Sequence, residues 1–102
     1  MNTAIFETGK IVATSLVIFE ANENKNFANF CFESLNRHKN GDWGDLQEED
    51  LQLNNLSLED GEGRILSSYN LPENISVENE SKIWIITEAD RSVTTILFPS
   101  QY

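Results

Sequence analysis

The sequence predicts an α+β fold, with N-terminal helices packed on an antiparallel β-sheet of three or more strands. Two observations lead to this class. Apolar residues recur at helical spacing in the first half, whereas runs of β-branched and aromatic residues separated by short polar breaks occupy the second half. The length of 102 residues, of which 39% are apolar, fits a single domain with a core of its own. We therefore predict one domain over residues 1–102.

The first half contains one well-marked helix and one ambiguous segment. Residues 10–19 are apolar and β-branched, which fits a strand or a short helix capped by Thr14 or Ser15. The polar residues 22–26 then offer N-cap groups, and apolar side chains follow on one helical face. These are Phe27, Phe30, Cys31 and Leu35. The pattern predicts a helix over residues 26–38 that ends at Asn40-Gly41.

A second helix is expected after the loop 41–44. Asp45 and Glu48 have the spacing of an N-cap and its acidic partner, and Gly61 supplies a stop signal. At 100° per residue its four leucines divide between two faces, so we expect apolar neighbours on both sides of the helix. One pair is Leu51 and Leu58, and the other is Leu53 and Leu56.

The second half reads as strands. Strands are predicted over residues 64–71, 82–87 and 92–98. The first alternates as a half-buried strand does, and the second is nearly continuous apolar, as in a central strand covered on both faces. Trp84 and Ile86 should therefore be largely buried. The polar residues 72–81 are expected to form a surface loop, and 88–91 the turn of a hairpin.

Acidic residues dominate the charge and are unevenly distributed. Seventeen Asp and Glu against seven Lys and Arg give a net charge of −10, which opposes non-specific binding to nucleic acid or anionic membranes. Residues 41–63 contain eight acids and no base. Such a segment could bind a basic protein surface or mimic nucleic acid phosphates, the alternative being a solvated face. The candidate binding residues are Asp42, Trp43, Asp45, Glu48, Glu49 and Asp50.

A second set of residues suits metal-independent RNA cleavage. That reaction needs groups that take and give a proton and a cation for the transition-state phosphate. The candidate catalytic residues are His38, Tyr69, Arg91 and Thr94. The alternative is structural: His38 between two cations at a helix C-terminus, and Arg91 closing a turn.

The sequence predicts no metal, cofactor or membrane segment. One cysteine, Cys31, and one histidine cannot build a disulfide or a zinc site, and the acids after residue 41 lack the register of an EF-hand loop. Cys31 is expected to be a buried hydrophobe. No apolar run approaches the roughly 18 residues of a membrane span, and the first residues lack the pattern of a signal peptide. We expect a soluble, cytoplasmic protein.

Two stretches carry a family resemblance. They are RHKNGDWGD at residues 37–45 and KIWIITEADRSVTTILFP at residues 82–99. They resemble a family of small uncharacterised bacterial proteins of plasmids, phages and other mobile elements, sometimes labelled as a type I restriction subunit. The resemblance implies no activity, and a chain of 102 residues is too short for a restriction methyltransferase. More loosely, helices followed by an antiparallel sheet resemble the barnase, RelE and EndoU ribonucleases.

The two functional hypotheses therefore differ in class. The first is a non-enzymatic interaction module that binds a basic protein partner, such as a host-defence or nucleic-acid-handling factor. The alternative is a metal-independent ribonuclease, the one case in which direct nucleic-acid binding is expected. The strong negative charge favours the interaction module, because an RNA-binding enzyme would have to overcome its own field.

Overall fold

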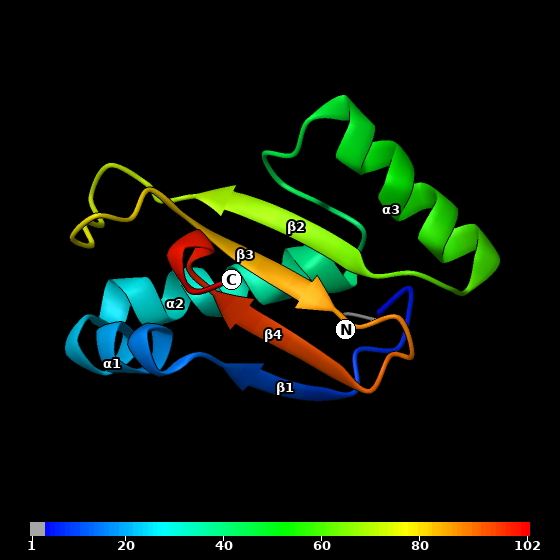
Figure 1. The fold of residues 1–102 in the computed structure, drawn as a ribbon. Coiled ribbons are helices and arrows are strands. Elements are labelled where there is room, and N and C mark those ends of the chain that lie inside the picture. Colours follow the sequence, from blue (N-terminus) through cyan, green and yellow to red (C-terminus); the bar gives the residue numbers. More distant parts are fainter. Residues whose placement is uncertain (1–3) are drawn as a thin grey trace.

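Four strands and three α-helices make up the protein in the computed structural model, which describes residues 4–102 (Figure 1). In chain order they are β1 (Lys10–Ala13), α1 (Ser15–Glu23), α2 (Lys25–Lys39), α3 (Glu48–Asp60), β2 (Ile65–Asn70), β3 (Lys82–Thr87), β4 (Val93–Leu97) and the 3-10 turn η1 (Pro99–Gln101). No helix within this part of the chain has the length and apolar character needed to cross a membrane.

The strands form one mixed sheet in the order β1-β4-β3-β2. β3 pairs antiparallel with β2 and β4, as predicted for a central strand flanked by a hairpin partner. β1 joins the other edge parallel to β4. The α+β class is therefore confirmed, but the sheet is not wholly antiparallel. The ambiguous residues 10–19 contribute to both structures, as strand β1 and then the start of α1.

The core lies between one face of the sheet and the helices α1 and α2, and α2 runs behind the strands in Figure 1. Strand alternation decides which side chains enter it. From β2, β3 and β4 these include Tyr69, Ile83, Ile85 and Ile96, and from the helices Val17, Phe27, Cys31 and Leu35. Cys31 is buried as expected, and burial raises the pKa of its thiol to about 12.

Helix α2 confirms the interpretation of its sequence. The side chain of Asn24 accepts hydrogen bonds from the backbone N–H groups of Asn26 and Phe27, at 2.9 and 3.2 Å. The helix ends before Gly41, whose φ of +80° is the conformation expected of a glycine after a helix. This ending places His38 at the last turn, over the strands.

Helix α3 does not lie on the α1/α2 face; it runs along the free edge of β2 (Figure 1). Its buried Asn54 makes the contact, because the amide donates to the carbonyl of Leu66 at 2.5 Å and accepts from the Leu66 N–H at 3.0 Å. The side chain thus pairs with β2 much as another strand would. An edge strand that is capped in this way is protected against pairing with another chain.

The loop before α3 continues this protection of the β2 edge. Gly44 forms a bridge with Ser68, and a side chain at Gly44 would place its Cβ 2.1 Å from the Ser68 carbonyl oxygen. The carboxylate of Asp45 accepts a hydrogen bond from the Asn70 N–H at 2.9 Å. Asp45 is therefore not the N-cap that we predicted. The helix begins at Glu48, after Gln47, whose side chain makes no capping bond.

Of three further expectations from the sequence, one is wrong and two hold only in part. Leu53 and Leu56 are 60% and 52% exposed, so α3 has an apolar neighbour on one side only. Residues 72–81 form a surface loop as predicted, but this loop also buries Ile75 and Val77 against the core. Ile86 is buried as predicted. Trp84 is only half-buried, because the face of the sheet opposite α1 and α2 is partly covered.

The Asn54 contact yields a stability prediction. Replacing Asn54 by Ala leaves both backbone groups of Leu66 without this partner at a half-buried site, and we expect a loss of about 2 to 3 kcal/mol. Asn55 is the matched control, because it is exposed on the same helix, and Asn55→Ala should change stability by less than about 0.5 kcal/mol. Denaturant unfolding of both variants measures the difference. Equal stabilities would contradict the role of Asn54.

Candidate functional site

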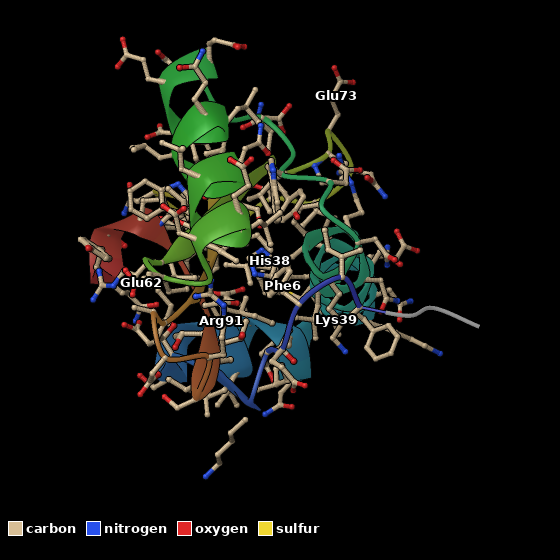
Figure 2. All side chains as sticks on the ribbon, turned by 90° about the vertical axis from the view of Figure 1, so that its right-hand side faces the viewer. Phe6, His38, Lys39, Glu62, Glu73 and Arg91 are labelled. Atoms are coloured by element: carbon tan, nitrogen blue, oxygen red, sulfur yellow. The ribbon has the colours of Figure 1, made fainter. Side chains whose placement is uncertain are left out.

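His38 lies at the centre of a buried chain of hydrogen bonds. Its Nδ1 contacts the Ser67 hydroxyl and its Nε2 lies 2.8 Å from Thr87 Oγ1. Thr87 is 2.7 Å from Thr94 Oγ1, which in turn donates to the carbonyl of Thr8 at 2.7 Å. The chain links α2 to three strands and to the N-terminal segment. Figure 2 shows His38 and Phe6 together in the interior, where their rings meet edge-on.

The positions of the protons in this series of hydrogen bonds follow from its last acceptor, the carbonyl of Thr8. Because Thr94 donates to a carbonyl, Thr87 must donate to Thr94 and accept from His38 Nε2–H. Nδ1 is then the acceptor of the Ser67 hydroxyl. Every group is satisfied with a neutral imidazole. Burial lowers the pKa of His38 to about 3, since an imidazolium here would have no counter-ion.

The other candidate catalytic groups also make hydrogen bonds within the protein. Tyr69 is buried and donates to the Asp42 carbonyl at 2.6 Å, and burial raises its pKa. The guanidinium of Arg91 donates to the carbonyls of Glu88 and Ala89 in its own turn, at 3.1 and 3.0 Å. It also donates to the carbonyls of Ser57 and Gly63 at the C-terminal end of α3, at 3.2 and 2.7 Å. It lies below the C-terminal end of α3 in Figure 2.

These contacts favour the structural alternative for the predicted catalytic set. His38, Tyr69 and Thr94 are each 0% exposed, so a phosphodiester in solvent cannot reach them in this conformation. Arg91 supplies the positive charge that the C-terminus of α3 otherwise lacks. His38, Tyr69 and Thr94 therefore do not line an open cleft in which a ribonuclease could bind RNA.

Three of the predicted binding residues serve the fold. Asp42 pairs with Arg37 at 2.7 Å and accepts from the Gly44 N–H; the bond from Arg37 is the main cause that lowers its pKa. Asp45 holds the β2 edge. Trp43 is 6% exposed and packs edge-on against His38. We therefore assign Trp43 to the core and not to a binding surface.

The remaining acids form a free negative surface on and beside α3. Within residues 4–102, ion pairs involve only the carboxylates of Asp42 and Glu88. Six acids of residues 48–62 thus have no cationic partner there, and they are Glu48, Glu49, Asp50, Glu59, Asp60 and Glu62. The first three suit the helix N-terminus, whereas Glu59 and Asp60 oppose the dipole at its C-terminus. Helix stability therefore does not explain the whole set.

An apolar groove runs beside this surface. It has a volume of about 330 Å³ and lies between α3, the uncovered face of the sheet and the C-terminal residue. We call it the α3 groove, and its lining residues are Asp50, Leu53, Asn54, Arg64, Leu66, Trp84, Ile86 and Tyr102. A second hollow of about 210 Å³ continues it toward the N-terminus of α3, because the two share Asp50, Leu66 and Trp84.

The walls of the α3 groove are held by specific contacts. Tyr102 meets Trp84 edge-on with ring centroids 5.8 Å apart, and its hydroxyl accepts from Arg64 at 2.8 Å. Arg64 also pairs with Glu88 at 3.1 Å. Sequence reasoning did not predict this site, since its residues come from four separate segments. The available signal was the large aromatic residue Trp84, which the sequence analysis predicts to be buried in a strand covered on both faces.

No metal centre is present in the part of the chain that the structure describes, where no group of three or more His, Cys, Asp or Glu side chains could hold an ion. Comparisons with protein-family models, with curated proteins and with solved structures found no match to this chain. The α3 groove and the acids beside it are therefore the features of the structure that bear on function.

The buried imidazole predicts a pH dependence of stability. In the unfolded chain His38 takes up a proton near its ordinary pKa of 6.5, whereas the native state resists protonation down to about 3. The unfolded state then binds more protons as the pH falls below 6.5, so the free energy of unfolding decreases by about 2 kcal/mol between pH 7.5 and pH 5.

His38→Gln should remove this decrease, because glutamine does not titrate. Denaturant unfolding at the two pH values measures it, and the carboxylates stay ionised over most of that interval. If the parent and His38→Gln lose the same stability between these pH values, His38 is not buried as a neutral group.

Proposed function

We propose that the protein is a non-enzymatic interaction module that binds a basic segment of a partner protein through the acidic surface of α3. The main support is that the six acids of residues 48–62 have no cationic partner within the described part of the chain. A patch of one sign steers an oppositely charged partner and accelerates its association.

The composition of the surface of α3 supports this proposal. Leu53 and Leu56 are exposed on the same helix as the acids, one beside the α3 groove and one on the outer side. Apolar residues surrounded by polar ones are the usual composition of a protein-binding surface.

The same charge argues against the ribonuclease alternative. A net charge of −10 repels the RNA backbone, and the imidazole that would exchange protons is sealed inside the protein. The buried set His38, Tyr69 and Thr94 is satisfied by the fold itself. No observation in the site favours a second function over binding.

The proposal predicts salt-sensitive binding that depends on α3. We take a short peptide of lysine, arginine, glycine and serine as the probe and measure its affinity and rates of association. Affinity should fall steeply between about 50 mM and about 300 mM salt. Neutralising the first turn of α3 (Glu48→Gln, Glu49→Gln, Asp50→Asn) should weaken binding about tenfold, chiefly through the association rate.

A matched variant separates a local surface from overall charge. Glu33, Glu73 and Glu78 are exposed on α2 and on the loop 72–81, and Figure 2 shows Glu73 pointing to solvent. Changing these three to Gln removes the same charge and should weaken binding much less. Equal losses in the two triple variants, or no binding of the peptide at low salt, would overturn the proposal.

A further inference from the structure

The α3 groove has features that the acidic surface alone does not explain. It combines an apolar floor of Leu66, Trp84 and Ile86 with a wall formed by Leu53. Trp84 is half-buried although it lies in the central strand. A large aromatic side chain that remains partly open to water in such a place gains stability when another apolar group covers it.

The groove lies directly beside the negative surface. Asp50 belongs to both, because it stands in the first turn of α3 and lines the two joined hollows. Arg64 and Lys82 also border these hollows, but Arg64 is already paired with Glu88. Lys82 lines only the smaller hollow, and the one cation that lines the α3 groove itself is the paired Arg64. A segment that lies along α3 with its positive charges would therefore reach the α3 groove beside Asp50.

The composition of the groove is typical of an anchor site. Tryptophan, tyrosine and arginine are the residues that most often contribute strongly to protein interfaces, and Trp84, Tyr102 and Arg64 supply all three. Its volume of about 330 Å³ is at the small end of the range of ligand sites, about 300 to 1,000 Å³. That space suits one large side chain better than a cofactor.

We infer that the α3 groove receives one large apolar side chain from the same basic segment that the acidic surface attracts. This inference rests on the proposed function and adds to it the pattern of the partner: lysines and arginines flanking a single aromatic or leucine anchor. The positive charges lie against the acids of α3, and the anchor packs between Leu53 and Trp84. Tyr102 forms the end wall, held by Arg64.

The inference predicts a gain in affinity from the anchor. We compare two short peptides of lysine, arginine, glycine and serine that differ at one central position, which is phenylalanine in the anchor peptide and serine in the blank peptide. Burial of the phenylalanine ring should make the anchor peptide bind about tenfold or more tightly than the blank. The indole N–H resonance of Trp84 should shift with the anchor peptide, whereas that of the buried Trp43 should not.

Two neighbouring leucines provide matched variants that leave the fold intact. Leu53 lines the groove and Leu56 does not, and both are more than half exposed. Leu53→Ala should remove most of the difference between the two peptides, and Leu56→Ala should keep it. Tyr102→Ala should reduce the difference as well.

The outcomes distinguish this inference from the proposed function. If both peptides bind equally and both weaken when α3 is neutralised, the proposed function stands and the anchor site is overturned. Binding of uncharged N-acetyl-phenylalanine amide as tight as that of the anchor peptide would also overturn it, since the groove would then serve a small apolar ligand. If neither peptide binds, both proposals fail.

Discussion

The placement of α3 depends on the pairing of one buried amide with one edge strand. Asn54 satisfies both the N–H and the carbonyl of Leu66, so the helix is fixed in position along β2 by directional bonds and not by an apolar stripe. Buried polar groups of this kind are costly to leave unpaired, which makes the orientation of the helix specific. With Asn54 facing β2, Leu56 and most of the acids must face outward, and Leu53 lies at the side of the helix that lines the α3 groove.

This orientation also creates the α3 groove. The helix stands beside the sheet instead of lying over it, and the C-terminal residue Tyr102 closes only one end of the space above Trp84. The opposite face of the sheet is different, because α1 and α2 cover it and the hydrogen bonds of His38 hold α2 to the strands. The face under α1 and α2 therefore packs into the core, and the face that carries Trp84 is partly open to solvent.

The sequence was sufficient for the elements whose signals are local. Asn24 and Gly41 mark the ends of α2, and the nearly continuous apolar run of residues 82–87 correctly predicts the central position of β3. The errors arise where tertiary contacts decide. Asp45 has the spacing of a helix cap but bonds to Asn70, and the polar chain around His38 joins residues up to 86 positions apart.

The candidate site shows the same division. The acidic character of residues 41–63 is visible in the sequence, whereas the structural duties of Asp42 and Asp45 depend on partners elsewhere in the fold. The α3 groove could not be predicted, because its floor, wall and end come from strands, helix and C-terminus that have no shared sequence pattern. Composition thus predicts a basic partner, and only the fold reveals the groove in which we propose that an anchor binds.

The most direct test of the account is a map of backbone amide resonances during titration with a basic peptide that carries one phenylalanine. We expect the shifts to concentrate on α3 and on the strand residues that line the α3 groove, and to be small on α1, α2 and the loop 72–81. Shifts spread evenly over the exposed acids, or centred on α1 and α2, would contradict the claim that α3 and its groove form the binding surface.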